Sequence, residues 1–134
     1  MNKAIGIFKN TSSQTLAAND NIGFSDMQMN SPTFGYANNS IQIRTPGLYR
    51  VDANFTIAGT AAGTVEVDLY QSGTANSSAS AIETIATASD IANLKFSTLV
   101  KVNPGATWNY ANLSFNNVTA STCTLASVIV EKIQ

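Results

Sequence analysis

One stretch of the sequence decides the fold class: GLYRVDANFTIAG, residues 47–59. Its apolar side chains recur at every second position from Tyr49 to Ile57, and polar side chains such as Arg50 and Asp52 occupy the positions between them. Successive side chains of an extended strand point to opposite faces, so this spacing puts the apolar groups on one face. The stretch therefore predicts a long β-strand with one face in a hydrophobic core.

The same period of two continues on either side of this stretch. In TVEVDLYQ, residues 64–71, it places Glu66, Asp68 and Tyr70 on the polar face of a second strand. Further strands are predicted at residues 4–9, 41–44, 81–87, 94–102, 107–115 and 122–133. Many short strands at a spacing of about ten residues predict an all-β fold, an antiparallel two-sheet sandwich.

Two segments follow this pattern less closely. Residues 14–40 are broken by Gly23, Pro32 and Gly35, and we expect a long ordered crossover with short pieces of strand there. The first 35 residues are accordingly the least regular part of the predicted domain. For residues 80–94 a short helix is the alternative to a strand, but the Ser and Thr residues are weak helix formers and favour the strand.

The composition indicates one domain, residues 1–134, and disfavours catalysis. With 134 residues and 14.1 kDa, the chain has a common size for a single domain. It contains no histidine and one cysteine, so it lacks the Ser-His-Asp and Cys-His arrangements, the commonest metal ligand and an internal disulfide. We interpret Cys123 as a small buried side chain. We expect no enzyme activity, no cofactor and no metal.

The charge pattern restricts the partners. Charged residues make up 11% of the chain, where about a quarter is usual, and the net charge is -1 with scattered basic residues. Without a basic patch, nucleic acid is not an expected partner. The apolar runs are far shorter than the roughly 20 residues of a membrane span, so we expect no membrane insertion. Residues 1–10 contain no signal-peptide hydrophobic region, and we expect synthesis in the cytoplasm without an export signal.

The last two predicted strands carry apolar residues on both faces. These strands are WNYANLSF, residues 108–115, and TLASVIVEKI, residues 124–133. One two-sheet sandwich covers a single face of a strand, so the sequence predicts that a subunit interface covers the other, with a sheltering loop as the alternative. The candidate interface residues are Trp108, Tyr110, Leu113, Phe115, Val128 and Val130.

Three polar-face side chains of the second strand are candidates for facing a ligand. Glu66 and Asp68 would present paired carboxylates to calcium or to acid–base chemistry, but a solvated face without a ligand is the commoner reading of such a pair. Tyr70 would stack on a sugar ring, alone or in a platform with Tyr36 and Trp108.

A family resemblance is carried by the central strands, IQIRTPGLYRVDANFTI at residues 41–57 and VEVDLYQSG at residues 65–73. They resemble the signature of the jelly-roll superfamily that contains tumour necrosis factor and the complement globular heads. In that signature a Pro-Gly-x-Tyr turn leads into a long core strand, and the next hairpin strand ends in a polar-Gly turn. The matching positions are Pro46, Gly47, Tyr49 and Gly73.

Two later stretches extend the resemblance. KVNPGATWNYANLSF, residues 101–115, is similar to the Gly-turn and penultimate strand of the family, with Pro104 and Gly105 at the turn. STCTLASVIVEKI, residues 121–133, is similar to the closing strand, although a Cys and a Thr stand where the complement heads carry an aromatic residue and a glycine. The resemblance implies an antiparallel two-sheet jelly-roll sandwich that associates as a homotrimer, is not an enzyme and binds a partner through its loops.

The resemblance, together with the absent export signal, points to the biological setting. We expect a virion protein, made in the host cytoplasm and most simply a phage capsid decoration or head-fibre protein that docks on the capsid lattice through its N-terminal segment. Loops such as residues 72–80 would then face outward. The alternative is a lectin-like host-receptor or carbohydrate-binding module whose partner is a surface glycan.

Overall fold

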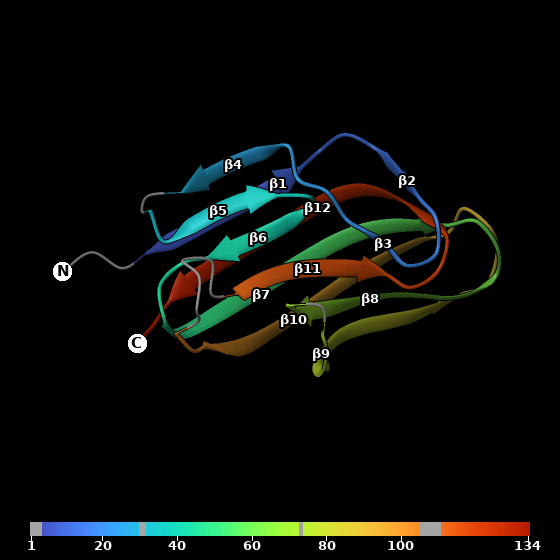
Figure 1. Cartoon of the computed structure of the whole chain (residues 1–134). Helices are drawn as coiled ribbons and strands as arrows, with labels where there is room; N and C mark the ends of the chain where they lie inside the picture. The colour runs from blue at the N-terminus through green and yellow to red at the C-terminus, as the bar shows by residue number, and fades with distance from the viewer. Residues whose placement is uncertain (1–3, 30–31, 73, 105–110) are drawn as a thin grey trace.

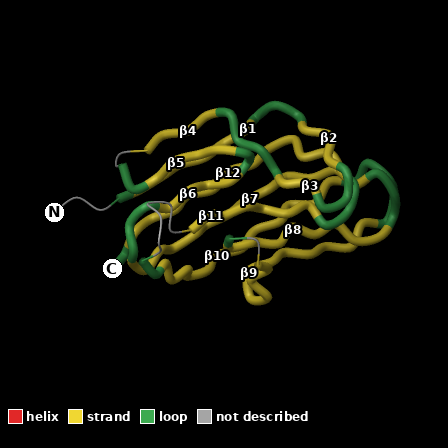
Figure 2. Tube along the Cα trace, viewed as in Figure 1, coloured by secondary structure: helices red, strands yellow, loops and turns green. Residues whose placement is uncertain are grey.

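Two antiparallel sheets stacked face to face make up the computed structural model, which describes residues 4–29, 32–72, 74–104 and 111–134 (Figure 1). Within these residues the chain forms strands, turns and loops and no helix (Figure 2). The backbone of residues 74–78 is described without their side chains. The all-β class and the two-sheet sandwich predicted from the alternation are therefore confirmed.

The first sheet contains the longest strand. In spatial order its members are β10 (Ile91–Val102), β7 (Gly47–Gly59), β12 (Ser121–Lys132), β1 (Ile5–Asn10) and β4 (Asp26–Met29), with β2 (Gln14–Leu16) also paired to β12. β7 lies between β10 and β12 and pairs with both along nearly its whole length. The long strands therefore lie side by side in this sheet, and β1 is joined to them through β12.

The second sheet lies against the inner face of the first. In spatial order its members are β5 (Phe34–Ala37), β6 (Ser40–Ile43), β11 (Ala111–Asn117), β8 (Gly63–Gln71) and β9 (Thr74–Ile85), with β3 (Asp20–Asn21) also paired to β11. The chain passes from one sheet to the other at every connection from β2 to β12 except those between β5 and β6 and between β8 and β9. Repeated crossing between two antiparallel sheets is the connectivity of a jelly roll.

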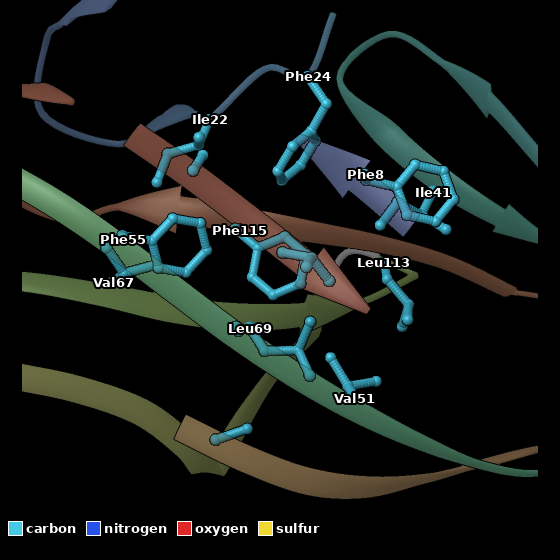
Figure 3. Packing of buried hydrophobic residues seen from close by; sticks show 14 of the residues in the cluster. Phe8, Ile22, Phe24, Ile41, Val51, Phe55, Val67, Leu69, Leu113 and Phe115 are labelled. Carbon is cyan, nitrogen blue, oxygen red and sulfur yellow. The ribbon is translucent and has the colours of Figure 1, made fainter. Parts of the chain in front are cut away.

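The hydrophobic core fills the space between the sheets. Phe55 of β7 and Phe115 of β11 are fully buried, and their ring centroids lie 5.4 Å apart across the two layers. Figure 3 shows Phe24 and Leu69 beside them, and the Phe24 and Phe115 ring centroids are 6.0 Å apart. Burial of each such side chain contributes about 1.5–3 kcal/mol, so this centre accounts for much of the stability of the sandwich.

In the Pro-Gly-x-Tyr turn that opens β7, the structure explains both the glycine and the tyrosine. Gly47 has φ +153°, and a Cβ there would lie 2.5 Å from the main-chain oxygen of Gln134. Glycine is therefore required where the C-terminus crosses the turn. The Tyr49 hydroxyl donates a hydrogen bond to the Thr45 oxygen, 2.6 Å away, and the ring packs edge-on against Phe34. The buried Tyr49 thus fastens the turn to the core, and desolvation raises its pKa to about 12.

The crossover at residues 14–40 contains four of the short strands, β2 to β5, as the sequence predicts. Amide side chains hold it to the sheets. The Gln14 side chain donates to the Gly23 oxygen at 2.9 Å and accepts from the Gly23 nitrogen at 2.8 Å. The fully buried Asn117 of β11 donates to the main-chain oxygens of Ala17 and Thr119. Side-chain hydrogen bonds of asparagine and glutamine therefore hold the crossover in place, where the sequence has no regular alternation of apolar residues.

Most strand ends agree with prediction to within one residue, and the differences have local causes. The helical alternative for residues 80–94 is wrong, because β9 ends at Ile85 and β10 begins at Ile91. A turn separates them, in which the Asp90 carboxylate accepts from the Thr87 nitrogen and Ser89 has φ +72°. Residues 72–80, expected as an outward loop, are mostly the first half of β9. Strand β11 is described from Ala111 onward, and residues 107–110 of the predicted strand lie outside the described residues.

Candidate functional site

Four predicted interface residues belong to the core of the single chain. Leu113 and Phe115 of β11, and Val128 and Val130 of β12, have no exposed surface. Their side chains point between the two sheets, so they are not on a surface that a second subunit would contact. The other two predicted interface residues, Trp108 and Tyr110, lie outside the described residues. The closing strand does carry apolar groups on both faces, as predicted, but Val128 and Val130 are on its core face.

The opposite face of β12 is the one that carries uncovered apolar groups. Leu125 is 37% exposed and Ile129 is 38% exposed, and Ile129 lies directly opposite the half-buried Ile7 of β1. Leu99 of β10 is 53% exposed and lies opposite Arg50 of β7. Cross-strand partners point to the same face, so these four apolar side chains share the outer face of the first sheet. We call Ile7, Leu99, Leu125 and Ile129 the apolar outer face.

Polar groups surround this apolar outer face. A shallow hollow of about 480 Å³ crosses β10, β7 and β12 and is lined by Ile129 together with Asp52, Ala53, Asn54, Lys95, Phe96, Ser97 and Ser127. Arg50 forms ion pairs with Asp52 at 3.4 Å and with Glu131 at 3.7 Å. Such exposed pairs contribute little to stability, but they keep charges of both signs beside the apolar groups. The arrangement is suited to a protein contact with an apolar centre and a polar rim.

Glu66 and Asp68 lie together on the outer face of the second sheet, as the alternation in β8 predicts. Hydrogen bonding to the Asp68 side chain is the main cause that raises the pKa of Glu66 to about 7. Partial desolvation and repulsion by the Asp68 charge act in the same direction. The pair is therefore close enough to act as a unit, which the spacing of two residues alone did not establish.

Asn116 joins this pair and was missed by the sequence reasoning. It lies directly opposite Asp68, on the neighbouring strand β11, and is only 8% exposed. The Oδ1 atoms of both residues are buried and have no hydrogen-bond partner. An unsatisfied buried acceptor costs about 1–3 kcal/mol. The polar face of ANLSFNN contains Asn116, but only the register of β11 on β8 shows which residue it meets.

The predicted tyrosine platform is not formed by the residues that the structure describes. Tyr70 is half-buried on the outer face of the second sheet, opposite Ser114. Tyr36 lies on the inner face, where its ring packs against Phe24 and its hydroxyl accepts from the Phe24 nitrogen at 2.9 Å. Burial raises the pKa of Tyr36, in agreement with a structural role. Trp108, the third member, lies outside the described residues.

Cys123 is a packing residue, as predicted. Its side chain is fully buried, and the thiol donates to the Leu125 oxygen at 3.3 Å. Burial raises the pKa of the Cys123 thiol to about 11, so the reactive thiolate is scarce near neutral pH. Among the described residues, no three His, Cys, Asp or Glu side chains gather around one point. In the same part of the chain there is no helix of the length and apolarity needed to cross a membrane.

Comparisons with known sequences find no relative. No protein-family model matches this chain, and no curated protein matches it. The likeness of this chain to known proteins is therefore a likeness of fold.

Comparisons with solved structures find similar folds over nearly the whole chain. Murine APRIL at pH 5.0 superposes with a TM-score of 0.75 at 8% identity, covering 98% of this chain and all of that one. The Eiger TNF structure from S. frugiperda gives a TM-score of 0.75 at 9% identity, covering 98% and 92% of the two chains. The PRD1 vertex protein P5, a phage jelly roll, gives 0.62 at 16% identity, covering 98% and 97%. Because its chain crosses repeatedly between two stacked antiparallel sheets and superposes on these structures, the protein has the TNF-like jelly-roll fold.

Proposed function

We propose that this chain is a non-enzymatic, trimeric surface protein of a phage virion, acting as a capsid decoration or head-fibre protein. The observation that carries the proposal is its likeness to the PRD1 vertex protein P5 over 98% of the chain. The similarity to APRIL and Eiger supports the trimeric part, because the superfamily resemblance implies threefold assembly. The lack of histidine supports a binding role over catalysis.

The proposed trimer buries the apolar outer face of the first sheet. Leu99 and Ile129 are large, apolar and exposed in the single chain, and water is a poor solvent for both. Residues Leu113, Phe115, Val128 and Val130 support this surface from the core side instead of contacting the neighbour. Trp108 and Tyr110 remain candidates for the interface. Threefold closure would hide these groups without leaving a free surface for further growth.

The trimer is tested by sedimentation equilibrium of the purified protein at micromolar concentration. The expected mass is three times the 14.1 kDa of one chain. A single species with the mass of one chain would remove the trimer from the proposal.

Decoration is tested separately, by mixing the purified protein with capsids that lack it. We expect saturable binding in a fixed ratio to the capsid protein, and the N-terminal segment should be needed for docking. Thr11→Glu and Ser13→Glu, at exposed positions just after β1, provide the matched control, provided that each variant retains its oligomeric mass. If the intact trimer stays in the supernatant when capsids are pelleted, the decoration role is excluded.

A glycan-binding role is the second candidate and has its own structural support. A polar hollow of about 590 Å³ is lined by Gln14, Thr15, Leu16, Asn19, Asp20, Asn21, Gly23 and Asn39. Amide and carboxylate groups of this kind form hydrogen bonds with sugar hydroxyls. A glycan array decides between the roles, with Asn39→Ala probing the hollow and Tyr70→Ala probing the outer face of the second sheet. Specific signals lost in either variant would favour the lectin-like role, and a blank array would favour decoration.

A further inference from the structure

The outer face of the second sheet carries two acceptor oxygens that lack hydrogen-bond donors. Asp68 of β8 and Asn116 of β11 are direct cross-strand partners, so their side chains point to the same face of the sheet. Asp68 Oδ1 and Asn116 Oδ1 are both buried without a partner. Facing oxygens of this kind repel each other unless a donor or a cation lies between them.

The orientation of the Asn116 amide is fixed from its other side. Its Nδ2 atom donates to the main-chain oxygen of Asn19 at 3.0 Å, and that oxygen is able only to accept. Asn19 leads into β3, which pairs with β11 at Asn116 on the side away from β8. Rotating the amide would place Oδ1 against the Asn19 oxygen. Oδ1 is therefore turned toward the β8 side, where Asp68 lies.

A third oxygen-bearing group completes the cluster. Glu66 lies two residues before Asp68 on the same face of β8, so the two carboxyl groups are neighbours along the strand. Two carboxylates and one amide oxygen, from two hydrogen-bonded strands, thus converge without a basic side chain in the register pairs around them. We propose that Glu66, Asp68 and Asn116 form a binding site for a divalent cation of the calcium class.

The ligand set favours calcium over other metals. All three groups offer oxygen, the donor that Ca²⁺ and Mg²⁺ prefer, and no nitrogen or sulfur ligand is among them. Calcium accepts irregular sets of side-chain oxygens and fills its remaining positions with water, whereas Mg²⁺ requires near-ideal octahedral geometry. Glu66 is only partly buried, so water and the ion are able to reach it. A bound ion would join β8 to β11 and so stiffen the second sheet at the level of β3.

The test compares the purified full chain in EDTA and in calcium, using its melting temperature and isothermal titration calorimetry. We expect calcium to raise the melting temperature and to bind at one site per chain with a dissociation constant on the order of 10⁻⁴ to 10⁻³ M. Magnesium at the same concentration should give a smaller rise. Neither measurement depends on the trimer or on capsid binding, so this proposal stands or fails independently of the proposed function.

Asp68→Asn is the decisive variant. In EDTA its melting temperature should exceed that of the parent chain, because the new amide is able to donate to Asn116 Oδ1 and one carboxylate charge is gone. That increase would also show that the variant folds. In calcium it should show no further rise and no binding heat.

Two further variants provide the comparison. Glu66→Gln should fold and should bind calcium more weakly than the parent chain. Asp26→Asn removes an exposed carboxylate of β4 in the other sheet, and it should respond to calcium as the parent does. A parent chain without a calcium response, or a response that survives in Asp68→Asn, would overturn the proposal. If Asp68→Asn has the higher melting temperature in EDTA but the parent chain does not respond to calcium, the two carboxyl groups only share a proton. That result would also overturn the proposal.

Discussion

Single side chains in this protein show how burial controls their chemistry. Tyr49 is fully buried and bonded to Thr45, while its raised pKa of about 12 lies above the ordinary value of 10. The folded state thus prefers the neutral phenol. Ionisation of Tyr49 in the folded state costs additional free energy, because the charged phenolate is kept from water, and this cost is absent in the unfolded chain.

This difference predicts alkaline destabilisation with a defined sign. The contribution of Tyr49 is fully present below pH 10, the unfolded value, and is lost as pH rises toward 12. Across that window the free energy of unfolding should fall by about 1.4 kcal/mol per pH unit from this group. Urea unfolding at a series of pH values measures it.

Tyr49→Phe is the control for that series. At neutral pH the free energy of unfolding of the variant should be lower by about 1 kcal/mol, because the hydrogen bond to Thr45 is lost. Above pH 10 its free energy of unfolding should then fall less steeply with pH than that of the parent chain. Parallel curves for the two proteins would show that Tyr49 does not carry the alkaline transition.

Cys123 allows a second prediction at the scale of one residue. It is the only cysteine in the chain and is fully buried, with a thiol pKa raised to about 11. A thiol reagent at neutral pH should leave the native protein unmodified and should label one thiol per chain in denaturant, as read by mass spectrometry. Rapid, complete labelling of the native protein would contradict the burial.

At the scale of elements, the alternation of apolar and polar residues predicted where strands form. It did not predict features that depend on which strands pair with each other. β7 was predicted from residue 47 to residue 59 and forms over those residues, because its Val51 and Phe55 side must lie inward in any sandwich. The apolar groups on both faces of β12 were also visible in the sequence. Which face is inner is set by the register of β12 on β7, a long-range pairing that alternation does not encode.

The same limit explains the candidate site. Glu66 and Asp68 are on one strand, so their proximity was predictable from the sequence. Asn116 meets Asp68 only through the pairing of β11 with β8, which brings together two residues 48 positions apart in the chain. Sequence spacing therefore identified the two carboxylates and missed the amide opposite them.

The corrected role of β11 gives a prediction at this scale. Leu113 is fully buried and pairs with Ile41 of β6, so Leu113→Ala should lower the free energy of unfolding by about 2–5 kcal/mol. It should leave the oligomeric mass of the folded protein unchanged. Ile82→Ala, at a position 60% exposed on β9, should change stability by about 0.5 kcal/mol or less. Dissociation of the oligomer without loss of stability in Leu113→Ala would instead place Leu113 at the interface.

At the scale of the whole molecule, the shortage of charge has a structural counterpart. With 11% charged and 44% apolar residues, the chain fills the core between two sheets and still leaves Leu99 and Ile129 uncovered on the first sheet. On the described part of the second sheet, Ile82 is a comparable exposed group but lies on the edge strand β9. Ile129 has apolar Ile7 as its cross-strand neighbour, and Ile82 has Glu66. The first sheet is therefore the better surface for association.

Two matched variants test this choice of surface. Ile129→Asp should dissociate the proposed trimer, because a charge in the centre of a buried apolar contact loses its hydration without gaining a partner. Ile82→Asp introduces the same charge at an exposed isoleucine of the other sheet and should leave the assembly intact. Sedimentation equilibrium measures the masses, and far-UV circular dichroism checks that both variants retain their β-structure. A trimer that survives Ile129→Asp but separates with Ile82→Asp would move the interface to the second sheet.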